Sequence, residues 1–252
     1  MEHIINIHTM GHGYTLGWKN DHRVLLDRLY IIHGGEGSYS VGDKTYPFLP
    51  GHSYYLPWTE QYTLSQNPDA PMDHTFVDFS GSASLLSFGI TDISPSDEPR
   101  FLPILTMIES MIDLCSVEED PGFYLVNDNE HCCPNVMNAS ILQLLELITL
   151  TYGAYQFNAP DIHHVLAYIH AHYREPLTVN DLAAVACLNP RYFIAKFTEV
   201  VHITPSRYLH DLRCDIAMSL IDRGMPLSRA AEETGFPSAS ALYRMIRNRR
   251  KT

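Results

Sequence analysis

Short hydrophobic segments separated by turn signals fill the first hundred residues. β-branched and aromatic side chains are concentrated in the segments 29–33, 38–41, 54–56 and 75–79. Pairs of residues that favour turns interrupt them, at 34–35, 42–43, 50–51, 67–68 and 80–81. Closely spaced segments of this kind are typical of an antiparallel β-barrel or sandwich. We therefore expect a β-rich N-terminal region.

Beyond residue 100 the hydrophobic spacing becomes helical. Residues 101–115 and 136–152 carry apolar side chains three and four positions apart, which predicts two helices. The stretch between them, residues 116–134, is acidic and rich in turn residues, so we expect a loop there.

The second of these helices has only a narrow polar stripe, formed by Gln143, Glu146 and Thr149. A helix with so little polar surface must be covered on two sides. We expect its own β domain to cover one side and a second subunit to cover the other. Burial entirely within one chain is the alternative.

The rest of the chain is predicted to be helical throughout. A first helix has its apolar stripe at Ile162, Val165, Leu166, Ile169 and Tyr173. We therefore expect three parts, namely a domain at 1–155, a linker at 156–161 and a helical domain at 162–252. The fold class is α+β, with a cupin-like β-barrel or sandwich followed by an all-α domain.

Capping residues divide the helical domain further. Thr178 with Asp181 resembles a capping box, Asn189 precedes Pro190, and Thr204 precedes Pro205. The helix after Asn189 is expected to bury Phe193, Phe197 and Val200. The helix that starts at Pro205 is expected to stop at Gly224, and two further helices are expected at 226–234 and 238–249.

Two helical hairpins emerge from this division, at residues 178–201 and 227–249. Their turns superpose with a 48-residue shift, which aligns Ala183 with Ala231 and Cys187 with Gly235. In each, a small residue lies where the helices cross, and a small residue makes the turn. This is the packing pattern of a helix-turn-helix unit.

The charge is distributed unevenly between the two predicted domains. The chain has 252 residues and a formal net charge of −12. Residues 1–160 contain 5 Lys and Arg against 20 Asp and Glu, whereas residues 161–252 contain 12 against 9. The sequence has no long apolar run and no recognisable secretion signal, and its five cysteines lack zinc-ligand spacing. We expect a cytoplasmic protein whose two domains have different partners, with a merely solvated basic C-terminus as the alternative.

At this point the sequence resembles the AraC/XylS-type transcriptional regulators. The resemblance rests on EPLTVNDLAAVACLNPRYFIAKF (175–197), ITPSRYLHDLRCDIAMSLI (203–221) and GFPSASALYRMIR (235–247). The segments at 28–58 and 74–81 resemble the cupin-like sensor of that family. The resemblance implies a regulator with no enzymatic activity and no cofactor. Its partners would be double-stranded DNA, a small effector, a second copy of the chain and RNA polymerase.

The resemblance also implies which residues meet DNA. They lie on the second helix of each hairpin and are Arg191, Tyr192, Lys196, Ser240, Tyr243, Arg244 and Arg247. The family often carries an arginine two residues after the buried Phe, where this chain has Ala195, whereas Arg244 stands two residues after Leu242. We therefore expect unequal reading of DNA by the two hairpins.

Two further positions depart from the family pattern. His202 stands before Ile203 where the family usually has glycine, and the sequence ends before the family's closing segment and helix. A module that binds an effector and no longer binds DNA is therefore an alternative function.

For the sensor we expect a sugar-like or aromatic ligand, because flat rings with a few polar groups suit both. The candidate contacts are His8, Tyr14, Trp18, Arg23, Arg28, Tyr30, Tyr39 and Trp58. The chain is expected to form a homodimer through the two helices at 101–115 and 136–152.

A cupin-type metalloenzyme with a helical appendage is the second alternative. Such enzymes use a His-x-His pair, but His52 has no neighbouring imidazole, and only Glu60 and His74 remain as partners. We expect no metal. Four further histidines share one predicted helix and are expected at its surface, namely His163, His164, His170 and His172.

Overall fold

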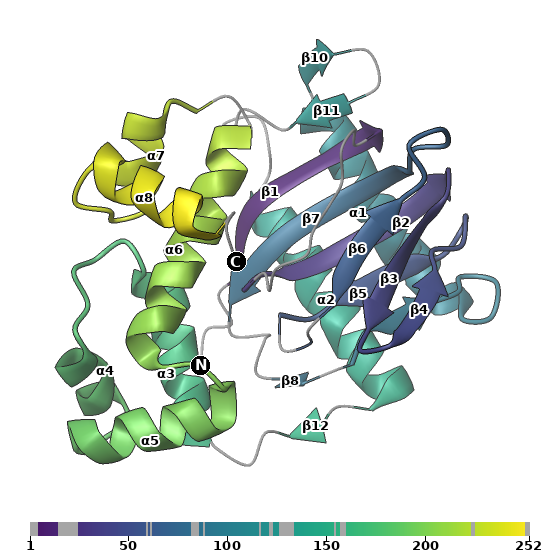
Figure 1. The fold of residues 1–252 in the computed structure, drawn as a ribbon. Helices are drawn as coiled ribbons and strands as arrows, with labels where there is room; N and C mark the ends of the chain where they lie inside the picture. The colour runs from purple at the N-terminus through teal and green to yellow at the C-terminus, as the bar shows by residue number, and fades with distance from the viewer. Residues whose placement is uncertain are drawn as a thin grey trace. The chain divides into compact units, whose positions relative to one another are not determined.

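The computed structural model divides the chain into two compact units, Met1–Tyr155 and Gln156–Thr252 (Figure 1). The residues it describes are 5–14, 25–58, 60, 62–81, 86–87, 89–115, 117–120, 123–125, 134–153, 155–156, 160–222 and 225–249. The first unit contains antiparallel sheets with two helices, and the second is helical, which is the α+β class that the sequence predicted.

Within the described residues, the first unit has two main sheets. The larger has the strand order β10-β11-β1-β7-β2-β5-β9, and the smaller has the order β4-β3-β6. The strands are β1 (Ile5–Tyr14), β2 (Asp27–Gly34), β3 (Gly37–Val41), β4 (Lys44–Pro47), β5 (Ser53–Leu56), β6 (Thr63–Gln66), β7 (Asp73–Gly81), β8 (Leu86–Ser87), β9 (Thr91–Ile93), β10 (Val117–Asp120), β11 (Phe123–Leu125) and β12 (Tyr155–Gln156). The four segments predicted as strands are confirmed.

Two predictions about turns and loops are wrong. Ser80 and Gly81 were expected in a turn, but both belong to β7, whose pairing with β1 continues as far as Gly81 opposite Ile5. The stretch 116–134 was expected to be a loop, but it contains β10 and β11, and β11 pairs with β1. Backbone hydrogen bonds form this edge hairpin, so the acidic composition does not reveal it.

Alternating side chains of the large sheet point to two faces. One face packs against the small sheet, where Tyr30 and Tyr54 share a core with Phe48 and Leu64. The other face packs against two helices, α1 (Leu102–Cys115), which follows the 3-10 helix η2 (Pro99–Phe101), and α2 (Pro134–Tyr152) (Figure 1). The first unit is thus a β-sandwich with helices on one outer face.

The apolar faces of α1 and α2 divide between the core and the surface. Leu145 and Ile148 lie in the core of their own unit, together with Ile141 and Leu144. The exposed hydrophobic side chains are Leu102, Met107 and Leu114 of α1 and Val136, Leu150 and Tyr152 of α2. The unit therefore covers one side of α2, and the surface that a second subunit would cover lies elsewhere on these helices.

The second unit consists of short helices. They are α3 (Pro160–His172), α4 (Val179–Val185), α5 (Pro190–Val201), α6 (Pro205–Asp222), α7 (Leu227–Glu233) and α8 (Ala239–Arg249). The helix α3 begins inside the predicted linker, because Pro160 suits a first helical turn. Val201, four residues after Phe197, is buried, whereas Val200 is only half-buried and was wrongly placed in the core. No helix in the described part of the chain has the length and apolarity needed to cross a bilayer.

The two hairpins have the same backbone geometry at their turns. Leu188 donates its N–H to the carbonyl of Ala183 at 2.9 Å, and Phe236 donates to Ala231 at the same distance. Cys187 has a φ of 54° and Gly235 a φ of 71°, so both turns use the left-handed region. The predicted 48-residue alignment of the turns is confirmed.

After the turn the shift becomes 49 residues. Asn189 accepts from the N–H of Tyr192, and Ser238 accepts from the N–H of Ala241, so each cap lies three residues before its donor. Phe193 and Leu242, which are 49 residues apart, are the fully buried anchors of α5 and α8. The second turn is therefore one residue longer than the first.

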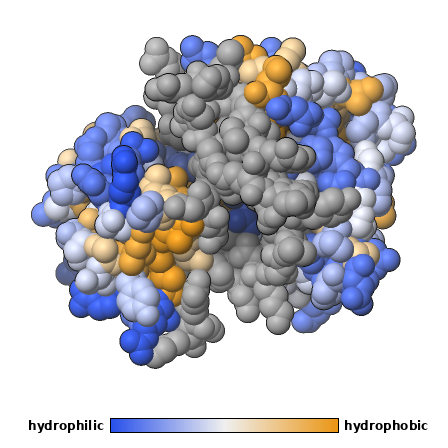
Figure 2. All heavy atoms as spheres, turned by 90° about the horizontal axis from the view of Figure 1, so that it is seen from above, coloured by the Kyte–Doolittle hydropathy of each residue, from blue (hydrophilic) through white to orange (hydrophobic). Residues whose placement is uncertain are grey.

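The core of the second hairpin is small. Its buried members are Ala217, Ala230, Ala231 and Leu242. Six hydrophobic side chains around them are only partly buried, namely Leu220, Ile221, Met225, Leu227, Phe236 and Ile246. Hydrophobic surface is accordingly visible on the helical unit, which lies on the left in Figure 2.

Two buried polar side chains hold the helical unit together. His170 was predicted at the surface, but it is only 2% exposed, and its Nε2 forms a 2.7 Å hydrogen bond with the hydroxyl of Tyr208. His170 follows Ile169 directly. The buried face of α3 is therefore wider than the apolar spacing suggested, and α6 covers His170. Arg213 donates to the carbonyls of Tyr173 and Glu175 just beyond the end of α3.

Candidate DNA interface and effector site

The helix α5 is held in place by its cap and by two aromatic anchors. Asn189 caps it and Pro190 occupies its first turn. Phe193 and Phe197 are fully buried, and the ring of Phe197 lies 5.7 Å from that of Tyr208 on α6. With these residues facing inward, the helix presents its opposite face to solvent.

The outward face of α5 carries several of the predicted DNA contacts. Arg191 is exposed, and so is Tyr192, with 53% of its surface accessible. Ala195 lies between them and the end of the helix and is also exposed. These three residues of the outward face are therefore accessible to a partner.

Lys196 occupies a different position from the other candidates. Its Nζ lies 2.6 Å from Oδ2 of Asp161 in the first turn of α3. Partial burial acts to raise the pKa of the Asp161 carboxyl, but the hydrogen bond from Lys196 and backbone hydrogen bonds outweigh it and lower that pKa. The ammonium group is therefore occupied within the unit. This pairing was not predicted, because the two partners are 35 residues apart in the chain.

The helix α8 exposes a more basic face. Leu242 is its buried anchor, and Ser240, Arg244 and Arg247 are exposed on the other side. Tyr243 is 56% exposed beside them. All four predicted side chains on α8 therefore lie at the surface.

A row of polar residues crosses three adjacent strands inside the β-sandwich. Thr9 of β1 is opposite Asp78 of β7, and Asp78 is opposite Arg28 of β2. Nε of Arg28 lies 3.2 Å from Oδ1 of Asp78, and both side chains are about nine-tenths buried. Burial raises the pKa of the Asp78 carboxyl, while Arg28 and a hydrogen bond from Thr9 oppose this rise.

Two tyrosines lie next to this ion pair. Burial raises the pKa of Tyr62 to about 12, and Arg28 acts against that rise. The pKa of Tyr30 is also raised by burial, with Arg28 and Asp78 as its charged neighbours. The structure thus brings together two predicted effector residues, Arg28 and Tyr30, and adds Tyr62 and Asp78. The strand alternation at 75–79 was the signal that could have placed Asp78 inside.

The other predicted effector residues are spread over the unit. Tyr39 is half-buried at the edge of the same core, and Trp58 is buried with its backbone N–H donating to Asp27. Nε2 of His8 lies 2.7 Å from the hydroxyl of Ser80. Three candidates fall outside what the structure describes, namely Trp18, Arg23 and the side chain of Tyr14.

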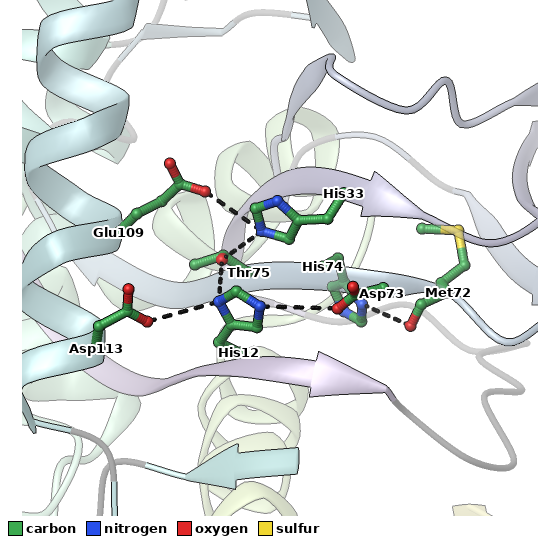
Figure 3. A network of polar contacts seen from close by, with 8 residues as sticks. All are labelled: His12, His33, Met72, Asp73, His74, Thr75, Glu109 and Asp113. Atoms are coloured by element: carbon green, nitrogen blue, oxygen red, sulfur yellow. Dashed lines mark hydrogen bonds and ion pairs between the residues drawn. The ribbon is translucent and has the colours of Figure 1, made fainter. Parts of the chain in front are cut away.

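The opposite face of the large sheet carries a second polar cluster, which the sequence analysis missed (Figure 3). The rings of His12 and His33 stack with centroids 4.6 Å apart, and Thr75 Oγ1 lies 3.2 Å and 2.9 Å from their nitrogens. Two carboxylates of α1 reach the pair, Asp113 at 3.6 Å from His12 and Glu109 at 3.3 Å from His33. Burial and the neighbouring His12 lower the pKa of His33. The cluster links the end of the sheet to α1.

Two of the residues considered for a metal site, His52 and His74, have different partners. His52 pairs with Asp92 through a 2.8 Å contact, while His74 is buried against the ring of Tyr30. Burial lowers the pKa of His74 to about 4. Across the described residues, no group of three or more His, Cys, Asp or Glu side chains has an arrangement that could hold a metal ion.

Comparison with known proteins agrees with the geometry of the hairpins. Residues 182–251 match the helix-turn-helix domain family. The chain is 24% identical over 222 residues to the probable transcriptional regulator LumQ of Photobacterium leiognathi, which covers 84% of this chain and 81% of LumQ. It is 32% identical over 84 residues to the regulator AlkR of Acinetobacter baylyi, covering 33% of this chain and 28% of AlkR.

The whole fold has a counterpart among solved structures. The crystal structure of unsaturated fatty acid bound ToxT from Vibrio cholerae aligns over 98% of this chain and 91% of that one, with a TM-score of 0.58 and 10% identity. This likeness shows a shared fold, from the β unit through both hairpins.

The chain is an AraC/XylS-type transcriptional regulator. As a member of this type it is a DNA-binding protein and not an enzyme, so the metalloenzyme alternative is set aside. For an AraC/XylS-type regulator, the outward faces of α5 and α8 are the candidate DNA interface, and the buried polar row of the β-sandwich is the candidate effector site.

Proposed function

We propose that the regulator binds DNA by placing α5 and α8 in successive stretches of the major groove. The observation that carries this is the equivalence of the two hairpins. Each has the same turn hydrogen bonds and a capped second helix, and each exposes the candidate contacts on the face opposite its buried anchor. On α5 these are Arg191 and Tyr192. A second helix held in this way is the element that reads base edges in helix-turn-helix proteins.

Selection of binding sites from random DNA with the full chain tests this proposal. We expect an enriched sequence with two conserved stretches. Arg244→Ala should weaken that site by roughly 5- to 150-fold and relax one position, because Arg pairs bidentately with guanine. Arg229→Ala is the matched control, since this exposed arginine of α7 is equally charged but lies outside α8. Failure to enrich any sequence would contradict the proposal.

For the β unit, residues 1–155, we propose binding of a small effector at the buried Arg28–Asp78 pair. A guanidinium and a carboxylate beside two tyrosine hydroxyls suit hydroxyl or carboxylate groups, and the surrounding rings suit a flat or apolar body. Sugars and aromatic acids both fit this description. The ligand named for the ToxT structure, an unsaturated fatty acid, adds apolar acids to the classes worth testing.

A thermal-shift screen of the full chain against sugars, sugar acids, aromatic acids and fatty acids tests the effector site. A hit should raise the melting temperature of the protein. The shift should be lost in Tyr62→Phe, which removes only a buried hydroxyl, and kept in Tyr46→Phe on the exposed strand β4. A hit that both variants bind equally well would place the effector elsewhere.

The exposed hydrophobic side chains of α1 and α2 support a homodimer through these helices. An effector that changes how the two units are placed would then control DNA binding. The target DNA implies action in the cytoplasm, with RNA polymerase as a further partner.

A further inference from the structure

The face of α5 that corresponds to the basic face of α8 carries no arginine at its centre. The 49-residue shift between the buried anchors aligns Ala195 with Arg244 and Ile194 with Tyr243. Ala195 is exposed, and Ile194 is 38% exposed although it is a large hydrophobic side chain. Ala195 therefore offers a methyl group where α8 offers the guanidinium of Arg244, and Ile194 adds hydrocarbon on the neighbouring side of the helix, where α8 has Tyr243.

The charged groups around Ala195 are paired or balance one another. Lys196 is held by Asp161 at 2.6 Å, on the flank of the helix. Arg191 and Glu199 are exposed on either side of Ala195, one turn before it and one turn after it, and their charges are opposite. A base edge directly opposite Ala195 therefore meets its methyl group, while the hydrogen-bond donors of this face, Arg191 and Tyr192, lie one turn earlier.

In the major groove only thymine presents a methyl group, and apolar side chains recognise it by contact. We propose that α5 reads thymine methyl groups through Ala195 and Ile194, while α8 reads guanine through Arg244. The inference rests on the proposed DNA-binding function and adds the chemistry that each hairpin recognises. It assigns a thymine-containing stretch of the operator to the first hairpin and a guanine-containing stretch to the second.

Replacing thymine by deoxyuridine tests this inference, because the exchange removes one methyl group and leaves every hydrogen-bonding group in place. The operator is first selected from random DNA with the full chain. The stretch whose guanine preference is lost in Arg244→Ala is assigned to α8, and the other stretch to α5. Thymine is then replaced at each position of both stretches, and binding is measured by fluorescence anisotropy at one fixed salt concentration.

We expect uracil in the α5 stretch to weaken binding by about fourfold for each contacted methyl, the effect of exposing one buried carbon group. The same exchange in the α8 stretch should have no effect. In Ala195→Ser combined with Ile194→Ser, thymine and uracil should bind alike, because the hydrocarbon surface is gone. Both residues are exposed, so this variant should keep its helical circular dichroism.

A gain of function provides an independent measurement. Ala195→Arg should change the sequence selected at the α5 stretch from thymine towards guanine, since it copies Arg244 at the equivalent position. An enriched operator that tolerates uracil throughout would overturn the inference and leave the proposed function intact. Selection of no operator at all would overturn both.

Discussion

The imidazole of His170 and the hydroxyl of Tyr208 form a buried 2.7 Å hydrogen bond between α3 and α6. His170 is fully enclosed, and burial lowers its pKa to about 4. A neutral histidine at this point therefore belongs to the folded state of the helical unit. Protonation of the folded chain is therefore unfavourable near neutral pH, because the charge would be buried.

This gives a pH dependence with a defined sign. The pKa of His170 in the folded chain is below the value of about 6.5 of an unfolded histidine, so the unfolded chain takes up the proton first as the pH falls. The stabilisation is complete above pH 6.5 and is lost towards pH 4. At most, about 3 kcal/mol of unfolding free energy is involved. Urea unfolding followed by far-UV circular dichroism between pH 7.5 and 4.5 measures it.

His170→Gln isolates this effect, because glutamine keeps a polar group near Tyr208 but does not titrate. It should flatten the pH dependence of the circular dichroism transition, whereas His164→Gln, exposed on the same helix, should not. Tryptophan fluorescence, from Trp18 and Trp58, reports the β unit, in which the buried His74 adds its own acid sensitivity. A dichroism transition equally acid-sensitive in His170→Gln would assign the effect to other groups.

A second prediction concerns the end of α5. His202 has a φ of 63°, in the left-handed region that favours glycine, and its N–H donates to the carbonyl of Thr198. Non-glycine residues are strained there, so His202→Gly should raise the free energy of unfolding by about 1 kcal/mol. His202→Ala is the control, because alanine keeps the Cβ that causes the strain. Equal stability of the two variants would show that the strain is absent.

Local signals in the sequence predicted much of this structure. The capping box at Thr178, the cap at Asn189 and the turn alignment of Cys187 with Gly235 depend on residues close in the chain, and all three are confirmed. These features need no tertiary information, because a cap or a turn is complete within four or five residues.

Contacts between distant residues were not predictable in the same way. The pairing of Lys196 with Asp161 spans 35 residues, and that of His170 with Tyr208 spans 38. The ion pair of Arg28 with Asp78 depends on strand register, which a single sequence does not fix. For this reason a lysine expected at DNA is bound to a carboxylate, and a histidine expected at the surface is buried.

The Lys196–Asp161 pair leads to a third prediction. Asp161 neutralises a lysine on the flank of the recognition helix, and Asp161→Asn should release its ammonium group to DNA phosphates. One additional phosphate contact should steepen the dependence of log K on log salt by about 0.9. Binding to unrelated DNA, measured over a salt series, should therefore strengthen in Asp161→Asn and return to the original slope in Asp161→Asn with Lys196→Met. A slope unchanged in Asp161→Asn would leave Lys196 with a purely structural role.

Substitutions in the buried face and in the exposed face of helices α1 and α2 should have different effects. Leu145 is buried among its own unit, so Leu145→Glu should unfold the β unit and not merely produce monomers. Leu150, at the other extreme, is 81% exposed on the same helix, and Leu102 of α1 lies at the same end, where the rings of Phe101 and Tyr152 stack. If these side chains meet their copies in a dimer, Leu150→Glu removes apolar contact on both sides of the interface and places two carboxylates there. Burial of one leucine contributes about 1.5–3 kcal/mol, so the dissociation constant should rise at least tenfold.

Gln143→Glu adds the same charge to the outer face of α2 without removing a hydrophobic side chain and serves as the control. Sedimentation of the full chain at micromolar concentration should show a dimer for the unaltered protein and for the control, and monomers for Leu150→Glu with unchanged circular dichroism. A monomeric unaltered protein, or a Leu150→Glu variant that dimerises as tightly, would show that these helices do not form the interface.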